Sequence, residues 1–260
     1  MKINEIKELL QQDEISKEVL EKLRNDERSG VKKLLSSYDK IQDKKLFYKK
    51  EYEKKSFYEN KCYNRGCKYI CGIDEVGRGP LAGPVVAAAV ILKKDSYFEG
   101  LNDSKKLSEK KREELYDKIT NEAIAYAICE VNNEEIEKYN IYNAARIAMQ
   151  RAVEKLDVKP DFLLIDAMPF ENYPIPSYSM VKGDEKSVSI AAASVIAKVY
   201  RDNLMKKYAS KYPYYDFENN AGYGTKKHLE GLRKYGITPI HRRDFEPIKS
   251  MIKRGGNDGQ

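Results

Sequence analysis

Two apolar segments that flank a turn beginning with two acids constrain the fold of this chain more than any other feature. The segments 69–73 and 85–92 are short, apolar and rich in strand-forming residues. Asp74 and Glu75 lie where the first segment gives way to the turn. Because an unpaired buried carboxylate is costly, two acids at the end of a buried strand indicate that a cation meets them there.

The turn after these acids is rich in glycine and proline. Glycines remove side chains from a loop, so that its amide N–H groups can closely approach a phosphate or a sugar. Carboxylates and phosphates are both anions, and a divalent metal ion between them would make the two compatible. The glycines and prolines of this turn are Gly77, Gly79, Pro80, Gly83 and Pro84.

Strands and helices alternate along the rest of the chain, which predicts an α/β fold with a mixed sheet and helices on its faces. Ser108 is the expected N-cap of a helix that continues through Ile119. The expected strands are 69–76, 85–92, 123–131, 162–166 and 177–181, the further helices are 141–156, 185–208, 225–235 and 245–252, and 212–222 is expected to be a loop.

The first part of the chain differs in composition from the rest. Apolar residues at helical spacing predict two or three short helices, interrupted at Ser29-Gly30. The segment 39–68 is rich in Lys and Tyr, which is typical either of a solvated linker helix or of an auxiliary nucleic-acid arm, and both interpretations stay open. We expect a helical, basic N-terminal extension at 1–66, a main domain at 67–252 with a helical C-terminal segment, and a disordered tail at 253–260.

The net charge of +7 favours a polyanionic partner, although a chain with 34% charged residues is also simply hydrophilic. The N-terminus is charged and lacks the apolar core of a signal peptide. The longest apolar run, 81–92, is too short to span a bilayer and contains Gly and Pro. We therefore expect a cytoplasmic protein without a membrane partner.

Further acids stand at the ends of predicted elements. Asp166 ends a buried strand, and if that strand neighbours the one carrying Asp74 and Glu75, the three carboxylates converge at one edge of the sheet. Asp184 precedes the long helix, where it could instead be an N-cap, and Asp166 alone could face solvent. Four carboxylates in a chain with two histidines are typical of an oxygen-ligand site for Mg²⁺ or Mn²⁺. Two such ions about 4 Å apart promote phosphodiester hydrolysis without a protein nucleophile.

Seven stretches resemble, in the same order, the motifs of the ribonuclease HII family. The resemblance covers roughly residues 69–252 and implies an RNase H-like fold with a mixed five-stranded sheet. It also implies endonucleolytic cleavage of RNA in duplex with DNA, and cleavage on the 5′ side of a single ribonucleotide embedded in duplex DNA. The matching stretches are 72–90, 102–107, 164–166, 181–186, 191–202, 222–225 and 241–247.

Residue roles follow from this resemblance position by position. The family's four catalytic, metal-binding acids match Asp74, Glu75, Asp166 and Asp184. The resemblance implies Mg²⁺ or Mn²⁺ as the cofactor, with two ions in the active complex, and a monomer that binds RNA–DNA hybrids and ribonucleotide-containing duplex DNA. The loop whose backbone reads the ribose 2′-hydroxyl matches Gly77, Arg78 and Gly79. Tyr223 matches the aromatic residue that packs against the sugar, and Lys105 matches a residue near the substrate phosphates. Val76 replaces the family's usual Ala.

Other basic residues leave more than one interpretation. Arg201 and Asp202 could form an ion pair on a helix surface. Arg242 and Arg243, together with Lys226 and Lys227, favour a surface that binds the nucleic-acid backbone.

The expected activity is two-metal hydrolysis that leaves a 3′-hydroxyl and a 5′-phosphate. One alternative is a ribonuclease HIII-type hybrid nuclease, a family that has Glu in place of the fourth Asp, so Asp184 and the helical N-terminus argue against it. A second alternative is a non-catalytic duplex-binding protein, which four intact acids argue against.

Overall fold

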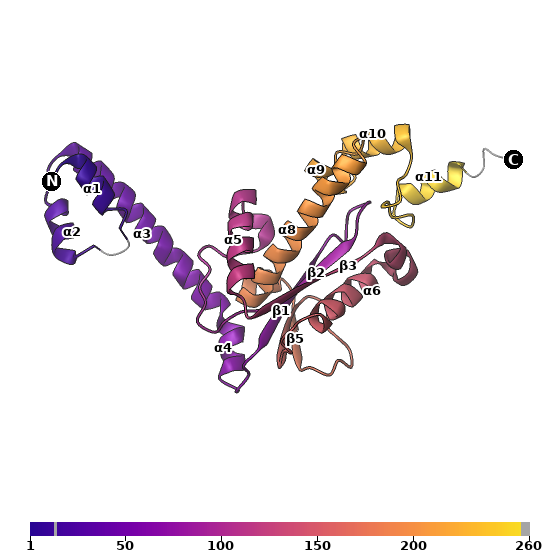
Figure 1. Ribbon diagram of the computed structural model, residues 1–260, viewed down its shortest axis with the longest axis horizontal. Coiled ribbons are helices and arrows are strands. Elements are labelled where there is room, and N and C mark those ends of the chain that lie inside the picture. The colour runs from indigo at the N-terminus through magenta and orange to yellow at the C-terminus, as the bar shows by residue number, and fades with distance from the viewer. Residues whose placement is uncertain (13–14, 256–260) are drawn as a thin grey trace. The chain divides into compact units, whose positions relative to one another are not determined.

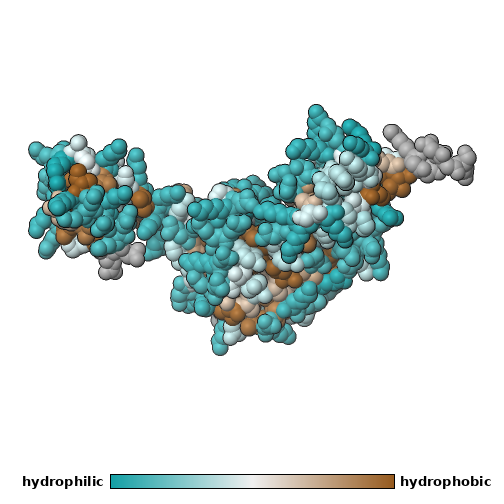
Figure 2. Space-filling view, turned by 45° about the horizontal axis from the view of Figure 1, so that its top comes forward, coloured by the Kyte–Doolittle hydropathy of each residue, from teal (hydrophilic) through white to brown (hydrophobic). Residues whose placement is uncertain are grey.

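The computed structural model describes residues 1–12 and 15–255, and the chain forms two compact units whose boundary lies between Glu53 and Lys54 (Figure 1). On the face shown in Figure 2 the surface is mostly hydrophilic, with small apolar patches among the polar side chains. Within the described ranges no helix has both the length and the apolar character needed to cross a bilayer.

The first unit contains α1 (Ile3–Leu9), α2 (Lys17–Arg24) and most of α3 (Ser29–Lys55). The prediction of short helices is wrong for α3, which is one helix of 27 residues. Gly30 lies in the first turn of α3 instead of breaking it, and a Cβ there would lie 2.8 Å from Ile3 Cδ1, so the glycine allows α1 to pack closely. The core of this unit is formed by Ile6, Leu23, Val31 and Leu35.

The second unit is built on the mixed five-stranded sheet that the sequence predicts, with strand order β3-β2-β1-β4-β5. The central strand β1 pairs antiparallel with β2 and parallel with β4, while β2–β3 is antiparallel and β4–β5 is parallel. Every residue of β2 is buried, as its continuous apolar sequence indicates. The strands are β1 (Ile70–Val76), β2 (Val85–Ile91), β3 (Ala125–Val131), β4 (Phe162–Asp166) and β5 (Ser177–Met180).

Helices cover both faces of this sheet (Figure 1). On one face, α6 (Asn133–Glu154) packs its alanines against the side chains of Cys71 and Ile73 on β1. On the other face, α8 (Val188–Lys211) approaches β1 so closely that a Cβ at Gly72 would lie 2.0 Å from the backbone carbon of Ser189. Because side chains alternate along a strand, Asp74 shares the α8 face with Gly72.

Two helix boundaries differ from the sequence prediction. The helix expected at 141–156 is preceded within α6 by a helical segment that local periodicity did not reveal. The two are separated at Asn140, whose backbone is left-handed (φ 62°) and whose side chain accepts the amide N–H of Asn143. The helix expected at 185–208 is two helices, α7 (Gly183–Lys186) and α8, because Ser187 between them is extended. The Ser187 hydroxyl then accepts the amide N–H of Ile190 and caps α8.

The remaining elements connect and flank this framework. The short helix α9 forms within the segment expected to be a loop. The last helix extends to Gly255, so it includes the first three residues of the expected tail, and 256–260 lie outside the described residues. These elements are α4 (Phe57–Tyr63), the 3-10 helix η1 (Ser104–Lys106), α5 (Glu109–Glu122), α9 (Phe217–Asn220), α10 (Lys226–Tyr235) and α11 (Ile248–Gly255).

Candidate functional site

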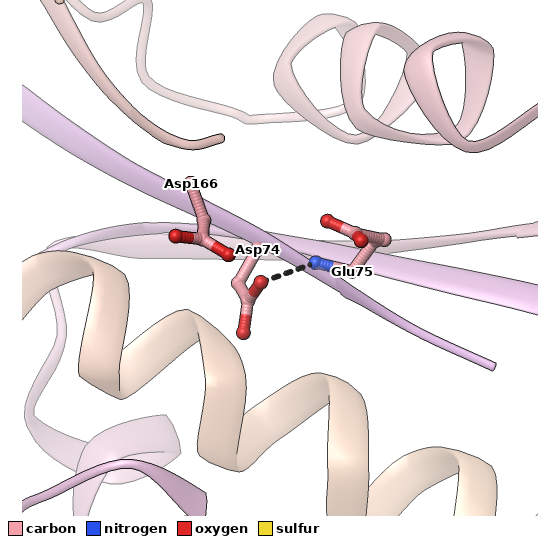
Figure 3. Close-up of side chains that lie close together, drawn as sticks. All are labelled: Asp74, Glu75 and Asp166. Carbon is pink, nitrogen blue, oxygen red and sulfur yellow. Dashed lines mark hydrogen bonds between the residues drawn. The ribbon is translucent and has the colours of Figure 1, made fainter. Parts of the chain in front are cut away.

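Three of the four predicted acids meet at one edge of the sheet. Ile73 of β1 is in register with Ile165 of the parallel strand β4, so the next residues, Asp74 and Asp166, lie side by side. Glu75 follows on β1, and its amide N–H donates a 2.8 Å hydrogen bond to Asp74 Oδ1 (Figure 3). Carboxylate oxygens of these three acids lie within 4.8 Å of one another, close enough to share a metal ion.

Asp184 lies outside this group of three but is tied to it through the backbone. The amide N–H of Gly183 donates a 2.6 Å hydrogen bond to Asp166 Oδ1. A Cβ at Gly183 would lie 3.2 Å from the same oxygen and 2.6 Å from Ile190 Cδ1, so only glycine lets the turn approach Asp166 this closely. Asp184 itself is buried in α7, and the negative charge of Asp166 contributes to the rise in its pKa.

Burial raises the pKa values of all four acids, and repulsion from neighbouring carboxylates adds to the rise. Asp74 is 6% exposed, and burial raises its pKa well above the ordinary value, with further repulsion from Glu75 and Asp166. Burial raises the pKa of Glu75 to about 7 and that of Asp184 to about 6. Burial also raises the pKa of Asp166, while a hydrogen bond from Gly183 opposes this rise. The protein therefore disfavours the ionised forms of these acids, because its own groups compensate their negative charge incompletely.

The cluster also contains a carboxylate oxygen available to a ligand. Glu75 Oε2 is buried and has no hydrogen-bond partner within the described part of the chain, while Oε1 lies 3.4 Å from Arg78 Nη1. Oxygen donors are what Mg²⁺ and Mn²⁺ prefer, and a divalent cation would satisfy the free oxygen and offset the repulsion. The residues present thus fit a divalent metal ion.

The glycine-rich turn lies beside these acids and beside Tyr223. Gly77 has a left-handed backbone (φ +91°), which favours glycine there. Arg78 and Gly79 are exposed, and a Cβ at Gly79 would lie 3.3 Å from Tyr223 Cε1. Tyr223 is 50% exposed, so its ring is accessible next to the turn.

Lys105 also lies near the acids, and so does Asp103, to which the sequence prediction gave no role. The positive charge of Lys105 lowers the pKa of both Asp166 and Asp184, in opposition to the dominant effect of burial. Asp103 is buried, accepts the amide N–H of Lys105 at 2.9 Å, and raises the pKa of Asp184. The signal for Asp103 was its place in the motif 102–107, where the sequence prediction assigned a role to Lys105 alone.

Two arginines differ from the sequence interpretation. Arg201 does not form the suggested surface ion pair, because its side chain is 1% exposed and Asp202 pairs instead with Lys198 at 2.7 Å. Arg242 is also 1% exposed, so it cannot form the basic surface proposed for it, whereas its neighbour Arg243 is exposed. Both buried arginines bind backbone carbonyl groups of the glycine-rich turn.

Comparison with known proteins assigns this site to a family. The family model described as Ribonuclease HII matches residues 71–248, and the model described as Ribonuclease HII N-terminal domain matches residues 2–63. The ribonuclease HII of Lactobacillus delbrueckii subsp. bulgaricus is 54% identical over 254 residues, which cover 97% of this chain and 98% of that protein.

Solved structures agree with this assignment. The crystal structure of ribonuclease H2 from Pyrococcus horikoshii OT3 has a TM-score of 0.61 at 25% identity, covering 72% of this chain and 98% of that one. Bst-RNase HIII in complex with Mn²⁺ has a TM-score of 0.57 at 18% identity, covering 73% of this chain and 70% of that one, and shows the shared fold. These matches confirm the expected RNase H-like fold. The chain belongs to the ribonuclease HII family and is a metal-dependent endoribonuclease that acts on RNA–DNA hybrids.

Proposed function

We propose that this enzyme hydrolyses the RNA strand of RNA–DNA hybrids, cuts on the 5′ side of single ribonucleotides embedded in duplex DNA, and leaves a 3′-hydroxyl and a 5′-phosphate. The observation that carries the proposal is the convergence of Asp74, Glu75 and Asp166, whose carboxylate oxygens lie within 4.8 Å of one another. Residues 67–252 form the catalytic domain, and 1–66 are an extension to it.

Asp74, Glu75, Asp166 and Asp184 would hold two Mg²⁺ or Mn²⁺ ions. When bound, such ions supply an activated water and stabilise the leaving oxygen. The protein residues set the arrangement of these carboxylates: Asp74 is held by burial, and the hydrogen bond from the Gly183 amide to Asp166 keeps the turn of Asp184 close to Asp166. Lys105, beside the same acids, offers a positive charge to the substrate phosphates.

Selection of a ribonucleotide is the task of the glycine-rich turn and Tyr223. The exposed backbone of Arg78 and Gly79 contacts the 2′-hydroxyl, the group that distinguishes RNA from DNA. The half-exposed ring of Tyr223, which lies against Gly79, packs on the sugar at the junction. We propose further that the enzyme acts as a monomer, as is expected from the resemblance to the family.

A single duplex tests this proposal. A 5′-labelled DNA duplex with one internal ribonucleotide is incubated with Mg²⁺ or Mn²⁺, and the product is sized and extended with a DNA polymerase to establish its 3′-hydroxyl. We expect one cut on the 5′ side of the ribonucleotide and no cut in the all-DNA duplex.

The variant Asp74→Asn should lower the cleavage rate by at least about a hundredfold, because it removes a charge from the metal-binding cluster. The exposed Asp117→Asn on α5 is the matched control and should cleave at the wild-type rate. Cleavage at another position, or full activity of Asp74→Asn, would contradict the proposal.

A further inference from the structure

Arg201 and Arg242 are two arginines buried side by side, and within the described residues neither forms a salt bridge with a carboxylate, although Arg242 lies over the ring of Phe245. Each is 1% exposed, and the two are among the largest fully buried side chains of the described protein. Burial lowers the pKa of Arg242 to about 9, and repulsion from Arg201 adds to this effect. Every hydrogen bond that the structure gives these two side chains goes to a backbone carbonyl group.

Arg242 binds both ends of the glycine-rich turn. Its Nη2 donates to the carbonyl of Gly77 at 2.5 Å and its Nη1 to the carbonyl of Arg78 at 2.9 Å. Its Nε and Nη2 both donate to the carbonyl of Gly83, at 3.0 and 2.8 Å. The backbone N–H of Arg242 donates to the carbonyl of Leu81 at 2.9 Å, so the backbone of Arg242 also binds the turn.

Arg201 binds the rest of the turn from α8. It donates to the carbonyls of Pro84 at 3.0 Å and Ala82 at 3.2 Å, and to Ala221 just before the segment of Tyr223. A Cβ at Gly77 would lie 2.2 Å from Arg201 Nε, so glycine is required here for space as well as for its backbone angle. The two guanidinium groups therefore bind the turn from its buried side.

The direction of these carbonyl groups fixes the direction of the neighbouring amides. In a trans peptide plane the C=O of one residue and the N–H of the next point in opposite directions. The carbonyls of Gly77 and Arg78 point inward to Arg242, so the N–H groups of Arg78 and Gly79 point outward. Both residues are exposed, and within the described residues neither amide donates a hydrogen bond to the protein.

These two outward amides lie where the ribose is expected. Gly79 is against the Tyr223 ring, and the Arg78 side chain reaches Glu75 of the acidic cluster at 3.4 Å. We propose that Arg242, supported by Arg201, is a positioning residue that aims the N–H groups of Arg78 and Gly79 at the 2′-hydroxyl and thereby sets the preference for a ribonucleotide. This inference rests on the proposed reading of the 2′-hydroxyl by the turn.

Lysine cannot replace arginine in this role. Arg242 makes four hydrogen bonds from three nitrogens of a rigid, planar group, which fixes two consecutive peptide planes. A lysine ammonium keeps the charge but donates from a single, flexible nitrogen. The variant Arg242→Lys therefore separates the geometry of the turn from its positive charge.

The test measures binding rather than cleavage. Dissociation constants are determined in Ca²⁺, with Mg²⁺ and Mn²⁺ absent and the substrate checked for integrity, for two duplexes that differ only in one ribonucleotide or its deoxy counterpart. In the wild type the ribonucleotide duplex should bind more tightly. The preference is expressed as the dissociation constant of the deoxy duplex divided by that of the ribonucleotide duplex. In Arg242→Lys this ratio should fall about tenfold, as expected if the two hydrogen bonds from the amides of Arg78 and Gly79 to the 2′-hydroxyl are lost. Binding to the all-DNA duplex should change little. The control Arg151→Lys, on α6 and paired with Glu135, should keep the wild-type ratio.

The outcomes distinguish the role of Arg242 from the proposed role of the turn. A folded Arg242→Lys that keeps the wild-type ratio within twofold overturns the role of Arg242. A wild type with no ribonucleotide preference overturns the proposed function of the turn instead. If Arg242→Lys does not fold, the wild-type amide resonances of Arg78 and Gly79 decide: they should shift more with the ribonucleotide duplex than with the deoxy duplex, and equal shifts overturn the inference.

Discussion

Glu75 shows how a single buried acid of the candidate site lowers the stability of the folded protein. Burial raises its pKa to about 7, an effect that the Arg78 guanidinium only partly offsets and to which Asp166 adds repulsion. The folded protein therefore holds a proton on Glu75 that the unfolded chain releases at lower pH. Without metal, stability should fall as the pH rises from about 4.5 to about 7.

The variant Glu75→Gln tests this sign. We expect it to raise the free energy of unfolding of the metal-free protein at pH 8 on the order of 1 to 3 kcal/mol, and to have little effect at pH 4, where Glu75 is protonated in both states. Urea unfolding in EDTA at both pH values measures the difference. Adding Mg²⁺ should stabilise the wild type more than the variant, and destabilisation of metal-free Glu75→Gln at pH 8 would contradict this account.

Among the secondary-structure elements, helix α8 supports the candidate site, because its first turn packs against the strand that carries Asp74. It lies against Gly72, two residues before Asp74 on β1, and its N-terminus is held by two side chains. Ser187 caps it directly, and Glu59 of α4 accepts the Ser187 hydroxyl at 2.5 Å and the Ser189 amide at 3.0 Å. Glu59 is buried, so α4 is joined to the helix that faces the acids.

Replacing Glu59 by Ala leaves buried donors of α8 without an acceptor. We expect Glu59→Ala to lower the free energy of unfolding by about 1 to 3 kcal/mol. Glu59→Gln should cost less, because it keeps the carbonyl acceptor and burial raises the pKa of Glu59, which favours its neutral form. Urea unfolding at pH 7 measures both, with the exposed Glu113→Ala on α5 as the control. A loss below about 0.5 kcal/mol in Glu59→Ala would show that the cap is dispensable.

At the scale of the whole molecule, the sequence predicted features that depend on local pattern. The positions of all five strands follow from apolar runs and turn residues, whereas the order of the strands in the sheet does not. The sequence predicted that the acids would converge if β1 and β4 were neighbours, and the parallel pairing of those strands meets that condition. The helical segment 133–139 and the break at Ser187 were missed. The backbone angles of Asn140 and Ser187 separate the helices at these points, and hydrophobic periodicity does not encode such angles.

The buried arginines show a different limit of sequence-based prediction. Arg201 and Arg242 stand in polar, basic stretches that are typical of a protein surface. Their burial depends on carbonyl groups of the turn 77–84, which is distant in the sequence from both residues. The sequence therefore suggested surface positions for both arginines, whereas in the fold they are buried and bind the turn of the candidate site.

We propose above that Asp74, Glu75 and Asp166 together bind a divalent cation. Crystals soaked in Mn²⁺ and measured at the manganese absorption edge test it directly, because anomalous scattering locates the ion independently of activity. We predict an anomalous peak within coordination distance of all three carboxylates in the wild type, and its loss in Asp74→Asn. An active wild-type protein whose Mn²⁺ peak lies away from these carboxylates would contradict the account.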